Sequence, residues 1–80
     1  MPVRILFLGP LADIAGCAES KAEAPLDWER LIAAVPAGVA EQLELSRVNV
    51  ACRGIVLADK TALAAIDGDE VALLPPVSGG

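Results

Sequence analysis

Two apolar segments at opposite ends of the chain constrain its fold more than any other feature. Residues 3–8 and residues 71–74 are runs of strand-forming residues in which Arg4 is the only charge. Such continuous runs are typical of strands that are covered on both faces or that lie centrally in a sheet. We therefore expect the two segments to pair in the centre of one sheet. They should run parallel, because a crossover helix can connect them.

The clearest helix signal lies between these two segments. Asp27 is a favourable N-cap residue, and apolar residues follow it at helical spacing: Trp28, Leu31, Ile32 and Val35. This stripe should pack across one face of the sheet. Pro36 ends the pattern, and residues 37–45 form a second helical segment whose inner residues are Val39 and Leu43.

Shorter segments complete the order of elements. Residues 11–16 predict a short helix, residues 19–24 an edge strand with alternating charges, residues 48–52 and 55–57 a hairpin around Arg53-Gly54, and Asp67-Gly68 a tight turn. We predict a single α+β domain over residues 1–80, with a mixed sheet of four to five strands packed on one main helix.

Composition narrows the classes of function. The net charge of −5 argues against nucleic-acid binding, which requires basic patches. No apolar stretch approaches the roughly 18 residues that span a bilayer, and no signal-peptide pattern opens the chain. We therefore expect a cytoplasmic protein that binds neither nucleic acid nor membrane. With 55% apolar residues in 80, part of the apolar surface should remain exposed as a binding patch.

The cysteines give little support to metal or thiol chemistry. Cys17 and Cys52 are far apart, no C-x-x-C spacing occurs, and the chain has no histidine. A zinc site or a cysteine–histidine pair is therefore excluded. We expect both thiols to be small buried residues.

The last six residues predict a projecting tail over residues 75–80. Pro75 and Pro76 should direct the chain away from the body, since proline fixes φ and favours extended geometry in the preceding residue. Val77, Ser78, Gly79 and Gly80 follow, and the extended reach is roughly 20 Å. Glycine permits close backbone approach, so the tail can present the Gly80 carboxylate to a partner. The alternative is a frayed terminus without a role.

Residues 67–80 also carry a family resemblance. They read D-G-D-E-V-A-L-L-P-P-V-S-G-G, which resembles the ending G-D-E-V-A-x-x-P-P-V-S/T-G-G of the sulfur-carrier (small) subunits of molybdopterin synthase. The first strand and residues 11–16 fit this family too. The resemblance implies a ubiquitin-like β-grasp fold. Two positions depart from the family pattern: Ala12, where arginine is common, and Cys52, where asparagine is frequent.

The resemblance implies a role for each tail residue and for several partners. A ubiquitin-activating-like adenylyltransferase would use ATP to form an acyl adenylate at Gly80, and a sulfurtransferase would convert it to a thiocarboxylate. The large subunit of a heterotetrameric synthase would then pass the sulfur to cyclic pyranopterin monophosphate, forming the molybdopterin dithiolene. Gly79 would give access and Pro75 and Pro76 direction. No cofactor would be bound permanently, only AMP transiently at Gly80, and no metal.

Four residues would contact the partner: Phe7, Leu74, Val77 and Ser78. For Phe7 and Leu74 a role in the core is an equal alternative, because both belong to apolar strands. The acidic turn of Asp67, Asp69 and Glu70 is expected to be solvated, or to meet basic residues of the activating enzyme beside the tail.

Other functions remain open at this point. The carrier could serve thiamin thiazole synthesis or tRNA thiolation, although thiamin carriers are usually shorter and lack the diproline. It could also be a ubiquitin-like modifier that forms isopeptide bonds through Gly80, or an interaction module whose tail has no role.

Overall fold

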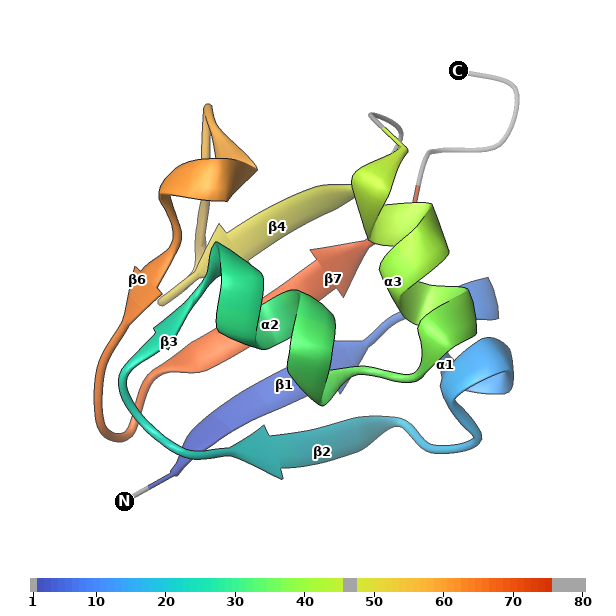
Figure 1. The fold of residues 1–80 in the computed structure, drawn as a ribbon, viewed down its shortest axis with the longest axis horizontal. Coiled ribbons are helices and arrows are strands. Elements are labelled where there is room, and N and C mark those ends of the chain that lie inside the picture. The colour runs from blue at the N-terminus through green and yellow to red at the C-terminus, as the bar shows by residue number, and fades with distance from the viewer. Residues whose placement is uncertain (1, 46–47, 76–80) are drawn as a thin grey trace.

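The computed structural model describes residues 2–45 and 48–75. In chain order its elements are β1 (Val3–Phe7), α1 (Pro10–Ala15), β2 (Glu19–Ala22), β3 (Leu26–Asp27), α2 (Trp28–Ala34), α3 (Ala37–Glu44), β4 (Asn49–Cys52), β5 (Ile55–Val56), the 3-10 turn η1 (Lys60–Ala62), β6 (Ala64–Ala65) and β7 (Glu70–Leu74) (Figure 1). The predicted order of strands and helices is confirmed. The two-residue strands β3 and β6 were not predicted.

The main sheet has five strands in the order β2-β1-β7-β4-β5. The two strands from opposite ends of the chain, β1 and β7, lie side by side and parallel, with Ile5 opposite Val71. The other neighbours in this sheet are antiparallel. Strands β3 and β6 form a separate two-stranded sheet. The predicted mixed sheet with paired terminal strands is therefore confirmed.

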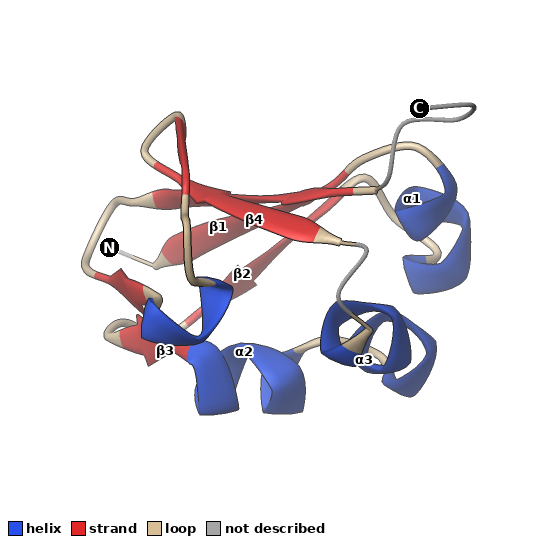
Figure 2. Ribbon diagram, turned by 90° about the horizontal axis from the view of Figure 1, so that it is seen from above, coloured by secondary structure: helices blue, strands red, loops and turns tan. Residues whose placement is uncertain are grey.

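The helices α2 and α3 cover only one face of the main sheet, as the view from above shows (Figure 2). Burial along β1 consequently alternates: Val3, Ile5 and Phe7 are buried, Arg4 is exposed and Leu6 is half-buried. Of the two interpretations of the terminal runs, a place inside the sheet is confirmed, whereas cover on both faces is wrong. An apolar run is compatible with a half-open strand, because the residues on the open face can serve as a contact surface.

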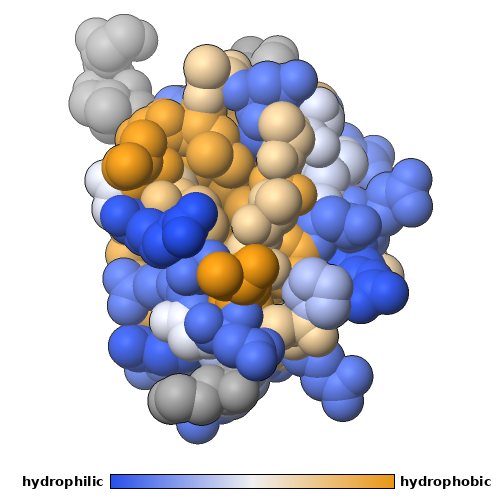
Figure 3. All heavy atoms as spheres, turned by 90° about the vertical axis from the view of Figure 1, so that its left-hand side faces the viewer, coloured by the Kyte–Doolittle hydropathy of each residue, from blue (hydrophilic) through white to orange (hydrophobic). Residues whose placement is uncertain are grey.

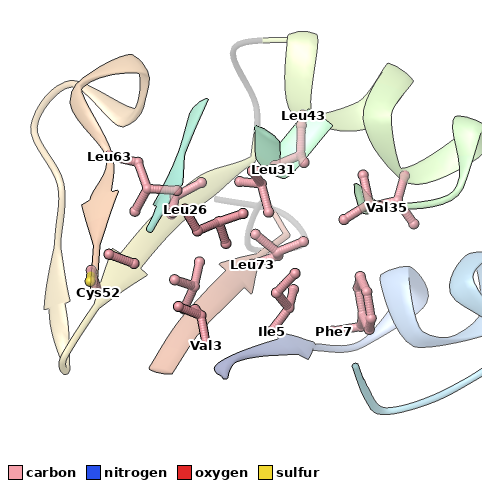
Figure 4. Packing of buried hydrophobic residues seen from close by; sticks show 14 of the residues in the cluster. Val3, Ile5, Phe7, Leu26, Leu31, Val35, Leu43, Cys52, Leu63 and Leu73 are labelled. Carbon is pink, nitrogen blue, oxygen red and sulfur yellow. The ribbon is translucent and has the colours of Figure 1, made fainter. Parts of the chain in front are cut away.

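The core lies between the sheet and helices α2 and α3. Leu31 of α2 and Leu43 of α3 are fully buried, and so are Ile5 and Leu73 of the central strands (Figure 4). Helix α2 begins as predicted, since the Asp27 carboxylate accepts a hydrogen bond of 2.9 Å from the backbone N–H of Arg30. The chain therefore buries an aliphatic core that holds both central strands in place.

Candidate functional site

The predicted tail begins at the end of β7, the strand in the middle of the main sheet. Strand β7 is hydrogen-bonded to β1 on one side and to β4 on the other, and it ends at Leu74. Pro75 follows and is half-buried. The remaining tail residues, to which the sequence assigned access, direction, contact and chemistry, lie outside the described residues: Pro76, Val77, Ser78, Gly79 and Gly80. What the structure provides is a fixed origin for the tail.

The loop after β1 passes close to this origin. Gly9 has φ of +55° and ψ of −133°, a conformation that side-chain-bearing residues rarely adopt. A Cβ atom at this position would lie 3.4 Å from Cγ of Pro75. The backbone turn therefore favours glycine here, and a side chain would touch the tail base at the lower limit of ordinary van der Waals contact.

Replacing Gly9 with alanine tests this contact. We expect Gly9→Ala to lower the free energy of unfolding by about 1–3 kcal/mol, the usual range for a residue held in a sparsely populated backbone conformation. Urea denaturation measures the loss. Gly54→Ala is the matched control, because Gly54 also has positive φ (+79°) but no atom lies within 4 Å of its Cβ position. A loss at Gly9 smaller than that at Gly54 contradicts the assignment.

An apolar patch lies on the open face of the sheet beside the tail base. It consists of Leu6, Ala51, Ala72 and Leu74, and we call it the open-face patch. The strand register places Leu6 and Ala51 on either side of Ala72. Leu8, which comes next in the alternation along the first strand, is 40% exposed. Ala51 is buried and the other three residues are half-buried, so the patch is a partly accessible apolar surface continuous with the start of the tail.

Ion pairs occupy the other end of the same face. Arg4 contacts Glu19 at 3.1 Å and Glu70 at 3.2 Å, and these carboxylates raise the pKa of the Arg4 guanidinium, with Glu19 the main cause. Because Glu70 begins β7 and Leu74 ends it, the ionic end is remote from the tail. The face is thus apolar beside the tail and charged away from it, which gives a docked partner a defined orientation.

The two described residues predicted to meet a partner differ in position. Phe7 is only 3% exposed and packs in the core. Of its two predicted roles, it therefore has the one in the core and not the one in partner contact. Leu74 is half-buried and belongs to the open-face patch. Sequence reasoning missed Leu6 and Ala72. Side chains alternate between the two faces of a strand, so residues next to Ile5 and Val71 face away from them. If only one face of the sheet had been assumed to be covered, this alternation would have placed Leu6 and Ala72 on the open face.

The acidic turn before β7 has a structural role that the sequence did not predict. Asp69 is buried, and its carboxylate accepts a hydrogen bond of 2.9 Å from the backbone N–H of Ile66 and lies 3.7 Å from Nε of Arg53. Glu70 pairs with Arg4. The expectation of a solvated turn is therefore wrong for Asp69, whereas Glu70 is exposed as expected. The turn precedes β7, about 13 Å from the tail base at ~3.3 Å per residue.

The two cysteines have different environments. Cys52 is buried, and its pKa is raised, first by burial and then by the charge of Asp69. Its thiol is 3.9 Å from the Asp69 carboxylate. Cys17 is exposed, so the prediction that both thiols are buried is wrong for this residue. Position 17 follows the Gly16 turn at the end of a short helix, where no element covers it.

Alkylation should separate the two thiols. We expect iodoacetamide at pH 8 to modify Cys17 first and Cys52 about tenfold or more slowly, because burial limits access and the raised pKa reduces the thiolate fraction. Intact mass spectrometry over time counts the adducts. Cys17→Ser should remove the fast adduct, and urea should restore rapid modification of Cys52. Equal rates in the folded protein contradict the environment described for Cys52.

The five-stranded sheet grasping two helices, with a tail leaving its central strand, defines a ubiquitin-like β-grasp domain. The family model described as ThiS family matches residues 5–80. The chain therefore belongs to the ThiS family, which comprises ubiquitin-like sulfur carriers and modifiers.

Solved structures agree with this assignment. The HVO 2177 protein of Haloferax volcanii is 25% identical with a TM-score of 0.75, over 100% of this chain and 87% of that one. SAMP1 of the same organism is 28% identical with a TM-score of 0.69, over the full length of both. A chain of the complex of subunits 1 and 2 of the molybdopterin-converting factor from Helicobacter pylori is 26% identical with a TM-score of 0.67, also over both full lengths. The search of curated sequences finds no match.

The described part of the chain shows neither a metal site nor a membrane-spanning helix. Within residues 2–45 and 48–75, no group of three or more acidic or cysteine side chains is placed to hold a metal ion. The helices described there are too short or too polar to cross a bilayer.

Proposed function

We propose that this protein is the sulfur-carrier subunit of a molybdopterin synthase and that Gly80 carries the sulfur. The observation on which this proposal depends is the P-P-V-S-G-G ending, which continues from the central strand beside the open-face patch. The family match extends through residue 80, and a molybdopterin-converting factor complex is among the similar structures. We place this activity in the cytoplasm.

The chemistry starts from an unreactive group. An α-carboxyl has a pKa near 3.3–3.7, so at neutral pH the Gly80 carboxylate is ionised and is a poor electrophile. In the proposed sequence an adenylyltransferase transfers AMP from ATP to this carboxylate and releases pyrophosphate. The terminal sulfur of a sulfurtransferase persulfide then displaces AMP and forms an acyl disulfide. A second thiol attacks the sulfurtransferase sulfur of this bond, which forms a disulfide on the enzyme and releases the Gly80 thiocarboxylate. The large subunit receives this sulfur and transfers it to cyclic pyranopterin monophosphate.

The chain's own residues serve delivery rather than bond making. Among the described residues at the tail base, Leu74, Pro75 and Gly9 carry no acid–base group, and neither does Asn49, which lies opposite Leu74. Acid–base groups must therefore come from the partners. In this proposal the open-face patch docks successively on the adenylyltransferase and on the large subunit, and each docking directs the tail toward an active site.

A charge placed in the open-face patch should disrupt docking. We expect Leu74→Asp to weaken binding to the large subunit by about thirtyfold or more, since it puts a carboxylate in an apolar contact that loses water on binding. Surface plasmon resonance measures the affinity. Ile14→Asp is the matched control, because Ile14 is 45% exposed on α1, outside the patch. Similar affinities for both variants and the parent chain contradict the docking role.

One experiment tests the pathway. Co-expression with candidate adenylyltransferases and a large subunit, followed by intact mass spectrometry, should show the oxygen-to-sulfur increment at the C-terminus. The loaded protein should then convert cyclic pyranopterin monophosphate to molybdopterin. Loading without this conversion favours a carrier for thiamin thiazole synthesis or tRNA thiolation.

A modifier is the second candidate, since SAMP1 is among the similar structures, and a related solved structure describes it as a small archaeal modifier protein. In that case the activated Gly80 carbonyl would be attacked by lysine amines of other proteins. Conjugates would then appear as a ladder on target proteins, and no free thiocarboxylate would accumulate.

A further inference from the structure

The two edges of the main sheet are protected unequally. The edge strand β2 carries Glu19 and Lys21 on exposed positions, and such charges prevent pairing with another chain. At the opposite edge, β5 presents Ile55 at 69% exposure and Val56 at 54%. Residues 54–58 include neither a charge nor a proline. Apart from the shortness of β5, which is two residues long, this edge lacks the usual protection, so it can accept a strand from another protein.

The free side of β5 is available for such pairing. Ile55 and Val56 pair with Cys52 and Ala51 of β4, and the backbone N–H of Leu57 continues this contact by donating to the carbonyl of Val50 at 2.8 Å. Among the described residues no strand pairs with the other side of β5. Its outward backbone groups can therefore accept a further strand.

A cavity adjoins this edge and adds a place for a side chain. It has a volume of about 390 Å³ and is lined by Cys52, Arg53, Ile55, Leu57, Ala62 and Ala64. Apart from Arg53 the lining is apolar, and Figure 3 shows apolar side chains gathered at this end of the molecule. An aliphatic side chain of an added strand would fit among them.

Arg53 supplies the charge preference of this site. Its φ is +53°, in a two-residue turn with Gly54 where asparagine, aspartate or glycine is usual. The left-handed conformation is unfavourable for a residue that carries a side chain. Its side chain is 64% exposed, and its ion pair with Asp69 is long, at 3.7 Å. The exposed guanidinium therefore remains accessible to a second anionic group besides Asp69.

We propose that the β5 edge and this cavity bind an extended segment of a partner protein. The segment adds to β5 as a strand, places an aliphatic side chain in the cavity and sets a carboxylate against Arg53. A second copy of this chain fits poorly, because each copy has a net charge of −5 and would bring another Arg53 to the edge.

Since Cys52 lies opposite Val71 and Asn49 opposite Leu74, the site is at the end of the sheet away from the tail. It can stay occupied while the tail is engaged, and it does not depend on the proposed sulfur transfer.

A peptide titration of the full chain tests this site. The probe is a short capped peptide of alternating valine and threonine with a terminal aspartate. The control peptide has asparagine in place of this aspartate. We expect saturable NMR shift changes at residues 53–57 and 62–64 and tighter binding of the aspartate peptide. Ile55→Lys, which puts a protective charge on the edge, should weaken binding by about tenfold or more. Lys21→Ala, on the other edge, should leave it unchanged.

Two variants separate the contribution of Arg53 from that of the tail. Arg53→Asn suits the turn, so it should keep the fold while equalising the affinities for the two peptides. Deleting Gly79 and Gly80 should leave peptide binding intact even if it abolishes sulfur loading. Absence of shifts at millimolar peptide, shifts centred on β2, equal binding of both peptides by the parent chain, or self-association through β5 would each overturn the proposal.

Discussion

Deletion of Gly80 is expected to reduce formation of the C-terminal thiocarboxylate by at least about 100-fold. The deletion moves the terminal carboxylate back by one residue, or about 3.3 Å, and a misplacement of 1 Å can already lower a rate by about this factor. It also replaces the Gly79-Gly80 ending, which allows close approach, with a terminus on Gly79. Intact mass after incubation with ATP, adenylyltransferase and sulfur donor measures the loaded fraction.

The same deletion should leave thermal stability unchanged. The core cluster extends from Val3 to Leu73, so shortening the chain at residue 80 removes none of it. Equal melting temperatures for the two proteins would assign the lost loading to the tail. Ser78→Ala, which keeps the length of the tail, is the matched control and should still be loaded. A protein without Gly80 that still supports molybdopterin synthesis would count decisively against the proposed role.

The order of strands and helices was predictable because caps and turns are local sequence patterns and the spacing of apolar residues is periodic. The Asp27 cap and the spacing of Leu31 and Val35 predicted the main helix. In the structure Asp27 is the N-cap of α2, and Leu31 and Val35 are buried. The pairing of β1 with β7 followed from two apolar runs at opposite ends of the chain. The two-residue strands β3 and β6 carry no period and could not be recognised, whereas β5, equally short, was identified by the turn at Arg53-Gly54.

Burial of individual side chains was less predictable, because it depends on contacts between distant segments. Phe7 is buried and Leu6 half-buried according to the face that the helices cover, which the sequence does not specify directly. Asp69 is charged, yet it is buried because the backbone of Ile66 and the side chain of Arg53 surround it. The candidate docking surface could therefore be outlined only after the open face was known.

Truncating Leu31 should remove a large share of the stability of this chain. Leu31 has no exposed surface and lies at the centre of the core with Leu26 and Leu73 (Figure 4). Removing three carbons from such a site leaves a cavity, and Leu→Ala changes of this kind destabilise proteins by about 2–5 kcal/mol. For 80 residues the total stability is only about 4–12 kcal/mol. Leu31→Ala should therefore lower the melting temperature by roughly 10 °C or more.

Ile32→Ala provides the matched control for this effect. Ile32 follows Leu31 on the same helix but is only partly buried at the margin of the core, so its truncation leaves a site that water can fill. We expect about half the loss of Leu31→Ala, since the cost depends on how completely the removed atoms were enclosed. Urea denaturation with equal m-values for the three proteins makes the comparison valid. A larger loss at Ile32 than at Leu31 would mean that α2 presents a different face to the sheet, and the register of the whole core would then have to be revised.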